Sequence, residues 1–257
     1  MSTGFYETFE GLSSTLKLGI STSQVAHFVD EKNLSADQID AIEKFLEYAN
    51  TVKNESIINT CLKLSRLPLK AQKTFEGFDF DRLHGPKMEE LKNIKNLTPL
   101  YEQRNVAFIG VAGIGKTHLA MAFGRECCLR GIKAYFLKAS ELNDRLTMAR
   151  RNDRVGSVIN GLVKPSCLII DEIGRCTFDK ENTRLFFDIV DRRSAKEGPN
   201  CMVFTSNINP KEWKQFFNED DALLCAMDRI YDNALVFMMY GTSFRGQHCE
   251  TITVEAK

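Results

Sequence analysis

The segment GVAGIGKT, from Gly110 to Thr117, constrains what this chain can fold into more than any other feature. It matches the pattern G-x-x-x-x-G-K-[ST] at every fixed position and lies between an apolar run and a helical pattern. Glycines in such a loop let backbone N–H groups turn inward around phosphates, and the following helix directs its positive end at the same anion. The pattern therefore predicts a phosphate-binding loop made of Gly110, Val111, Ala112, Gly113, Ile114, Gly115, Lys116, Thr117 and His118.

Phosphoryl chemistry at such a loop also needs a metal ion and a positioned water. We expect Lys116 to reach the β- and γ-phosphates and the Thr117 hydroxyl to ligate Mg²⁺. Asp171 and Glu172 end a second apolar run, LIIDE, where Asp171 suits the Mg²⁺ shell and Glu172 suits activation of the attacking water. Two acids after a strand can also form a solvated turn, but a paired acid after a phosphate loop favours hydrolysis over phosphorylation of a small molecule.

Three further polar residues are candidates for the same site. Asn207 ends the apolar run CMVFTS, where its amide can hold the water or the γ-phosphate, or can form an ordinary turn. Arg229 lies in a helical pattern, and Arg245 follows the last apolar run. Each arginine can neutralise charge on the transferred phosphate or can belong to a surface salt bridge. The residues by themselves leave these alternatives open.

Short apolar runs alternate with amphipathic helical patterns from residue 105 onward. This alternation predicts an α/β fold, with a parallel sheet and helices on both of its faces. Ligands bind such sheets at the carboxyl ends of the strands, where the candidate residues lie. The expected strands cover 105–110, 133–138, 167–171, 201–206 and 234–240. The expected helices cover 116–130, 140–162, 181–196 and the regions around 210–218 and 221–231.

The start of the chain predicts a separate, small helical domain. Residues 22–60 show helical spacing, with a capping box formed by Ser35 and Gln38. Residues 62–82 are basic at first and then aromatic, which indicates a linker followed by a segment that packs on the next domain. We therefore expect an N-terminal helical domain at 1–65 and an ATPase-type domain at 66–257.

The two predicted domains differ in charge although the whole chain is neutral. Residues 1–60 contain four lysines and nine acids, which leaves 30 basic and 25 acidic residues for the rest. An acidic segment binds nucleic acid poorly, so it favours docking of a protein partner. No run of about 20 apolar residues predicts a membrane span. The N-terminus lacks a secretory pattern and the eight cysteines form no C-x-x-C pair, so we expect a cytoplasmic protein with reduced, mostly buried thiols.

The motifs GKTHLA, IIDEIG, TSN, MDR and SFR, in this order, resemble those of the IstB/DnaC branch of the AAA+ ATPases. The segments LSRLP and FEGFDF, between residues 64 and 80, look like those of IstB-type proteins, which are ATPase helpers of insertion-sequence transposition. The resemblance covers about residues 60–247. The chain departs from the family at Phe244, where relatives often have Tyr, and in residues 1–60, which are less basic than in many relatives.

This resemblance implies a fold, a cofactor and an assembly. It implies an AAA+ core with sheet order 5-1-4-3-2, ATP with Mg²⁺, and oligomers in which a neighbouring subunit completes each site. By position, the family's functional residues fall on Lys116 and Thr117 (Walker A), Asp171 and Glu172 (Walker B), Asn207 (sensor 1), Arg229 (arginine finger, in trans) and Arg245 (sensor 2, in cis).

A group of cations follows the second expected strand. In initiator-type relatives, helices at this position line the DNA channel, and contacts to phosphates give affinity without sequence choice. A solvated helix face is the alternative. The candidate DNA contacts are Lys138, Arg145, Arg150, Arg151 and Arg154.

The resemblance therefore implies an ATPase that forms a ring or helix on double-stranded DNA and delivers this target to an IstA-type transposase. The alternative is a DnaC-like loader of the replicative helicase that acts on single-stranded DNA, since the core motifs are shared. A small-molecule kinase and a nucleotide-dependent binding module with little turnover are weaker alternatives. The aromatic segment at Phe75–Phe80 is one candidate for contact with the adenine.

Overall fold

The computed structural model describes residues 3–218 and 227–244, and the chain divides into two compact units, Met1–Thr60 and Cys61–Lys257. We predicted the boundary slightly later, between residues 65 and 66. The long helix α3 (Ala36–Leu64) runs through the division between Thr60 and Cys61 and ends just before the predicted boundary, so the secondary structure does not mark the division. The docking role of the N-terminal unit stays a prediction.

The N-terminal unit consists of α1 (Thr3–Leu16), α2 (Thr22–Glu31) and the first part of α3. The predicted capping box is present at the start of α3. The Ser35 N–H donates to Gln38 Oε1 (2.8 Å), and the Gln38 N–H donates to Ser35 Oγ (3.3 Å). The helical character predicted for this part of the chain is thus confirmed. Four buried apolar side chains form its small core: Phe5, Phe9, Val25 and Val29.

The second unit is built on a five-stranded parallel sheet. The order across the sheet is β2-β3-β4-β1-β5, which is the predicted 5-1-4-3-2 taken from the other edge. The predicted α/β fold class and strand order are therefore confirmed. The strands are β1 (Val106–Gly110), β2 (Ala134–Lys138), β3 (Cys167–Ile173), β4 (Cys201–Ser206) and β5 (Leu235–Met239).

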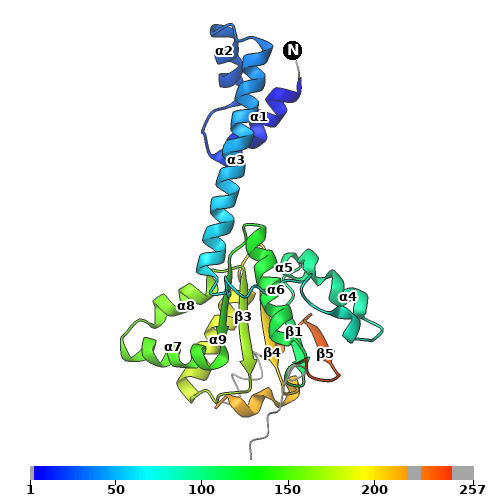
Figure 1. Ribbon diagram of the computed structural model, residues 1–257. Coiled ribbons are helices and arrows are strands. Elements are labelled where there is room, and N and C mark those ends of the chain that lie inside the picture. The colour runs from blue at the N-terminus through cyan, green and yellow to red at the C-terminus, as the bar shows by residue number, and fades with distance from the viewer. Residues whose placement is uncertain (1–2, 219–226, 245–257) are drawn as a thin grey trace, which may run out of the picture. The chain divides into compact units, whose positions relative to one another are not determined.

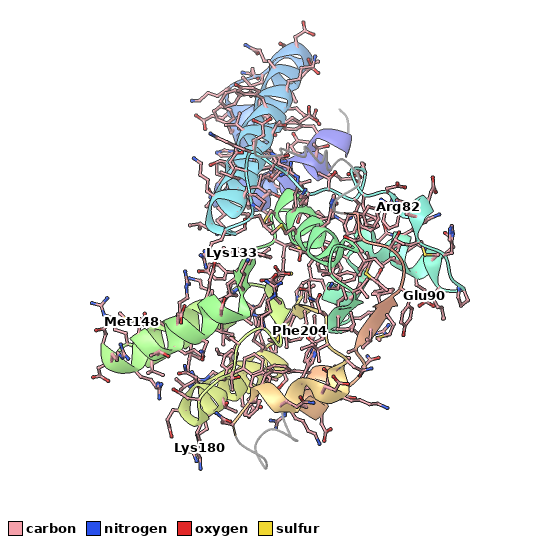
Figure 2. The ribbon with its side chains drawn as sticks, turned by 60° about the horizontal axis from the view of Figure 1, so that its bottom comes forward. Arg82, Glu90, Lys133, Met148, Lys180 and Phe204 are labelled. Carbon is pink, nitrogen blue, oxygen red and sulfur yellow. The ribbon has the colours of Figure 1, made fainter. Side chains whose placement is uncertain are left out.

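Alternate residues of the central strands pack into two separate cores, one on each face of the sheet. Phe108 and Val203 belong to the first core, whereas Ile109 and Phe204 belong to the second. Phe204 is labelled in Figure 2 and is completely buried. Because both faces are covered, these strands are continuous apolar runs in the sequence and do not alternate with polar residues.

Helices cover both faces of this sheet (Figure 1). On one face, α6 (Lys116–Leu129) contacts four of the strands and contributes Leu119 and Phe123 to the first core. The second core is formed with α7 (Ala139–Arg151), α8 (Val155–Val163) and α9 (Lys180–Ser194). The remaining helices are short: η1 (Phe80–Arg82), α4 (Met88–Asn93), η2 (Ile94–Asn96), α5 (Thr98–Tyr101) and η3 (Pro210–Phe216).

Two of the expected helices differ in detail from the structure, and a third is described only in part. The helix expected over 140–162 is two helices, because the chain turns between α7 and α8, where Asp153 has a left-handed φ of 52°. The 3₁₀ helix η3 replaces the helix expected around 210–218. Of the helix expected over 221–231, residues 227–231 are helical and the rest lies outside the described residues.

Predictions about burial are confirmed within the described residues. Leu67, Phe75 and Phe78 are buried in the first core, so the aromatic segment packs on the second unit as expected. Six cysteines are free thiols, and five of them are buried. Within residues 3–218 and 227–244, no helix is both long enough and apolar enough to cross a membrane.

Candidate functional site

Four of the polar residues singled out in the sequence, Lys116, Thr117, Glu172 and Asn207, lie at the carboxyl ends of β1, β3 and β4. They border a cavity of about 360 Å³. Its walls come from the loop between β1 and α6, from the end of β3 and from the end of β4. The residues that line it are Lys73, Ala112, Gly113, Gly115, Lys116, Thr117, His118, Met121, Glu172, Ile173, Gly174, Arg175, Thr205, Ser206, Asn207, Ile208 and Phe244.

Glycines in the loop between β1 and α6 have conformations and surroundings that exclude larger side chains. Gly113 and Gly115 have φ values of 80° and 93°, which other residues rarely adopt. A Cβ on Gly110 would lie 2.1 Å from the Met239 carbonyl oxygen, and one on Gly115 would lie 2.5 Å from the Phe78 ring. The loop can therefore close tightly around a ligand only with glycine at these positions, which agrees with a phosphate cradle.

Lys116 lies at the first position of α6, and its ammonium group faces its own loop. The side chain is 6% exposed, and Nζ donates to the carbonyl oxygen of Val111 (2.8 Å). The first turn of α6 adds the positive end of the helix at the same place. The loop thus combines a buried cation with a helix N-terminus, which together can hold an anion.

Thr117, Asp171 and Thr205 form a connected group below the loop. The hydroxyls of Thr117 and Thr205 both donate to Asp171 Oδ1, at 2.8 Å and 2.5 Å. Asp171 is 2% exposed, and this burial raises the pKa of its carboxyl group, although the two hydroxyl hydrogen bonds act in the opposite direction. Hydroxyl and carboxylate oxygens are the ligands that Mg²⁺ prefers. The predicted pair of Thr117 and Asp171 therefore fits a magnesium site.

Glu172 reaches the cavity through a distortion of β3. Ile170 pairs with Phe204 and Ile173 pairs with Ser206, so Asp171 and Glu172 together face one residue of β4, which is Thr205. This is a bulge, and Glu172 has a left-handed φ of 61°. Its backbone N–H donates to the Thr205 hydroxyl oxygen (3.0 Å). One threonine hydroxyl therefore binds both acidic residues.

The carboxylate of Glu172 is held by two cations. Its oxygens lie 3.3 Å from Lys138 Nζ and 3.1 Å from Arg175 Nη1, and the side chain is 28% exposed. Lys138 ends β2 and pairs with Asp171 across the sheet, which brings its ammonium group to the acidic pair. Lys138 lies beside Glu172, and the role predicted for it in binding DNA stays a prediction.

Asn207 lies on the cavity wall directly after β4, as predicted for a group that holds water or phosphate. The hydroxyl of the preceding Ser206 donates to the Ile173 carbonyl oxygen (2.6 Å) and accepts from the Ile208 N–H (3.0 Å). This Ser206 hydroxyl ties the chain around Asn207 to the end of β3. The structure thus brings Asn207 together with Glu172 and the loop in one cavity.

An aromatic cluster borders the cavity next to α6. Phe78 lies close to the rings of His118 (5.3 Å) and Phe244 (5.9 Å), measured between ring centroids. The Phe244 N–H donates to the Gly113 carbonyl oxygen (2.8 Å), and Arg82 stacks over the Phe244 ring. His118 Nε2 contacts the Thr74 carbonyl oxygen (2.8 Å), and burial lowers the pKa of this imidazole. The expected role of the segment Phe75–Phe80 near the nucleotide stays a prediction, but Phe78 does lie against the loop.

Sequence reasoning missed several residues of this wall. Thr205 and Arg175 each lie three or fewer residues from a predicted site residue, so proximity in the chain was a usable signal for them. Phe244 was noted only as a departure from the family. Lys73 and Met121 carry no motif, and only the folded chain brings them to the cavity.

The two candidate arginines have different outcomes. Arg229 lies in the helix 227–231, and its guanidinium contacts Asp191 of α9. The Asn105 side chain, just before β1, donates to the carbonyl oxygens of Ile230 (3.0 Å) and Arg229 (3.5 Å). The backbone of Arg229 therefore lies at the amino end of β1, whereas the cavity lies at its carboxyl end. Arg245 lies outside the described residues.

The other predicted DNA contacts lie on and after α7. The Arg145 guanidinium donates to the hydroxyl of Tyr135 and stacks on its ring, and Arg150 forms an ion pair with Asp179. Arg151 and Arg154 are exposed. Figure 2 labels Met148, which lies on α7 and is half exposed. The role of these arginines in binding DNA stays a prediction.

Fold and cavity together define a P-loop nucleotide-binding protein of the AAA+ class. The loop at the end of β1, the acidic pair in β3 and the polar residues after β4 lie at adjacent strand ends, in the sheet order predicted for that class. The chain belongs to the family of IstB-like ATP binding proteins, whose family model matches residues 15–251.

Individual relatives agree with this family. The chain is 30% identical over 207 residues to the ATP-binding protein of insertion sequence IS232 from Bacillus thuringiensis subsp. berliner, covering 80% of this chain and 81% of the relative. It is 30% identical over 223 residues to that of IS5376 from Geobacillus stearothermophilus, covering 87% and 86%. The replicative helicase loader DnaC of Escherichia coli strain K12 is 27% identical over 169 residues, covering 60% and 69%.

Solved structures agree on the fold. AMPPCP-bound DnaA from Aquifex aeolicus superposes with a TM-score of 0.55 at 19% identity, covering 68% of this chain and 51% of that one. At this identity the likeness concerns the fold alone. It confirms the AAA+ architecture of the second unit.

Proposed function

We propose that this protein is an Mg²⁺-dependent ATPase that assembles on duplex DNA in the cytoplasm and delivers it to a transposase. The observation that carries the proposal is the bulge in β3, which presents Asp171 to Thr117 and Glu172 to the cavity. A protein that only bound the nucleotide would not need an acid at the second position.

The residues at the cavity have distinct roles in this proposal. Backbone N–H groups of the loop and the ammonium of Lys116 hold the phosphates, and Thr117 and Asp171 would hold Mg²⁺. The ion would neutralise charge on the β- and γ-phosphates when it is bound. Glu172 accepts a proton from the attacking water, and Asn207 orients that water.

Assembly follows from the position of Arg229. Its backbone lies at the end of β1 opposite the cavity, so we infer that it serves the nucleotide of a neighbouring subunit. An arginine in this role neutralises charge on the transferred phosphate and increases kcat by about 10³–10⁵-fold. ATP would then hold subunits together, and hydrolysis would release them. Arg245 is proposed to act on the nucleotide of its own subunit.

The relatives from IS232 and IS5376 support a role in transposition, since both are ATP-binding proteins of insertion sequences. We propose duplex DNA as the substrate and a transposase as the protein partner. Arg151, the last residue of α7, and Arg154, just before α8, are both exposed and are the best candidates for phosphate contacts. The acidic N-terminal unit is the candidate surface for the transposase.

Sedimentation with fluorescent DNA tests this function against its main alternative. The protein is mixed with duplex or single-stranded DNA of equal length, with ATP, with ADP or without nucleotide. Large complexes on duplex that require ATP would support the transposition helper. The relationship to DnaC is the reason to test a second function, that of a helicase loader. Small complexes that prefer single-stranded DNA would replace the proposal with this function. The Lys116→Ala variant is the control, because it should form neither complex.

A further inference from the structure

The helix 227–231, which carries Arg229, is fixed to the rest of the second unit by contacts from several elements. Ile230 is buried in the second core, and the Tyr231 ring packs against Trp213 at 5.6 Å between centroids. The segment after the helix is tied to the residues before β1, because Arg104 Nε donates to the Asn233 carbonyl oxygen (2.9 Å). A further contact, from the Asn105 side chain, reaches the backbone of Arg229 itself.

Asn105 uses both ends of its side-chain amide. Nδ2 donates to the carbonyl oxygens of Ile230 (3.0 Å) and Arg229 (3.5 Å), while Oδ1 accepts from the Met202 N–H in β4 (2.9 Å). Its backbone carbonyl accepts from the Leu235 N–H in β5 (2.8 Å). One residue therefore joins two strands to the last turn of the helix.

The side chain of Arg229 is not held strongly by its own ion pair. Its partner Asp191 and Arg229 itself are 49% and 48% exposed. An exposed ion pair is weakened by the surrounding water, so it does not determine where the arginine lies. The position of the guanidinium therefore depends on the backbone of its helix, and Asn105 restrains that backbone.

We propose that Asn105 is a positioning residue for Arg229 and holds it in place for the nucleotide of the neighbouring subunit. This inference rests on the proposed role of Arg229 in trans. Asn105 lies at the amino end of β1, away from the cavity of its own subunit. Its loss should therefore change how fast the neighbour hydrolyses ATP and leave nucleotide binding to its own subunit intact.

The variant Asn105→Asp tests this role with little change of shape. The aspartate keeps the acceptor for the Met202 N–H but places an oxygen against the Ile230 carbonyl, where Asn105 has a donor. A shift of about 1 Å at a reacting group can cost about 100-fold in rate. We expect a kcat roughly 10–100-fold lower in the presence of DNA, with the Kd for ATP unchanged. Asn105→Ser removes the same donor without a charge and replaces the aspartate variant if that variant does not fold.

Mixing subunits separates positioning from a general structural effect. Glu172→Gln subunits lack the base but carry an intact Arg229 helix. Added to Asn105→Asp subunits, they should restore turnover, because they supply correctly placed arginines to sites that still have Glu172. Gln103→Ala is the matched control. Gln103 precedes Asn105 by two residues, and its side-chain amide donates to the Gly198 carbonyl oxygen (2.9 Å), not to the helix that carries Arg229. This variant should behave as wild type.

Arg229→Ala, tested in the same way, distinguishes the two proposals. If Arg229→Ala is inactive and is rescued by Glu172→Gln subunits, Arg229 acts in trans. In that case, normal turnover by Asn105→Asp, or a loss that Glu172→Gln subunits do not restore, overturns the positioning role. If Arg229→Ala keeps normal turnover or is not rescued, the trans role itself is wrong and the inference about Asn105 fails with it.

Discussion

Replacing Thr205 with valine is the most direct test of how the acidic pair is held. The hydroxyl donates to Asp171 Oδ1 and accepts from the Glu172 N–H, and the side chain is completely buried. Valine has the same shape but neither function. The Glu172 N–H then has no acceptor, which costs about 1–3 kcal/mol, and Asp171 loses a hydrogen bond of similar strength.

These losses overlap, so we expect the free energy of unfolding to fall by about 2–4 kcal/mol. For a unit of this size, that corresponds to a Tm roughly 5–15 °C lower. Turnover should fall further than stability suggests, because the bulge that aims Glu172 at the cavity loses its anchor on β4.

Thr205→Ser is the matched control, since it keeps the hydroxyl and loses only a methyl group. Thermal unfolding and steady-state ATP hydrolysis would be measured for both variants. We expect the serine variant to lie near wild type in kcat and the valine variant to lose most of its activity. Equal Tm and equal kcat for the two variants would show that the hydroxyl does not hold the acidic pair.

Further variants test the base, the phosphate loop and the predicted DNA contacts separately. Glu172→Gln should lower kcat by about 10³-fold and leave ATP-bound complexes on DNA, as measured by sedimentation, and hydrolysis at the normal rate would exclude Glu172 as the base. Gly115→Ala should abolish ATP binding in a calorimetric titration, because its Cβ would lie 2.5 Å from the Phe78 ring; unchanged affinity would mean that the loop tolerates a different conformation. Charge reversal at Arg150 and Arg151 should weaken DNA binding and reduce the dependence of DNA affinity on salt concentration, because contacts to phosphates are lost. The affinity for ATP should stay constant. Because Arg150 pairs with Asp179, Arg151→Glu alone is the cleaner variant, and retention of DNA binding in both would place the DNA elsewhere.

The strands and the phosphate loop could be predicted because both depend on local patterns, whereas the strand order was implied by the family resemblance and not by the pattern itself. Apolar runs of strand length recur between amphipathic segments, and GVAGIGKT contains its glycines and its lysine within eight residues. Contacts across the sheet could not be predicted in this way. Lys138 was grouped with Arg145 because it flanks the arginine cluster in the chain, and only the register that pairs Lys138 with Asp171 shows that it also lies beside Glu172.

The split between α7 and α8 shows a similar limit. Residues 140–162 have helical spacing throughout, and no glycine or proline interrupts the sequence at the turn. The turn instead depends on Asp153 in the left-handed region, which aspartate tolerates better than most residues. The aromatic wall had no signal either, since Phe78 and Phe244 are far apart in the chain and meet only at the loop.

The bulge in β3 explains why two consecutive acids can serve one site. In a regular strand, neighbouring side chains point to opposite faces of the sheet, so Asp171 and Glu172 would be separated. The extra residue and the left-handed φ of Glu172 break this alternation, at a cost of about 1–3 kcal/mol for a residue other than glycine. The hydrogen bond from its N–H to Thr205 and the ion pairs with Lys138 and Arg175 offset part of that cost. Lys138 and Thr205 lie on the neighbouring strands β2 and β4, whereas Arg175 follows Glu172 by three residues, so the conformation of Glu172 depends on the assembled sheet as well as on its local sequence.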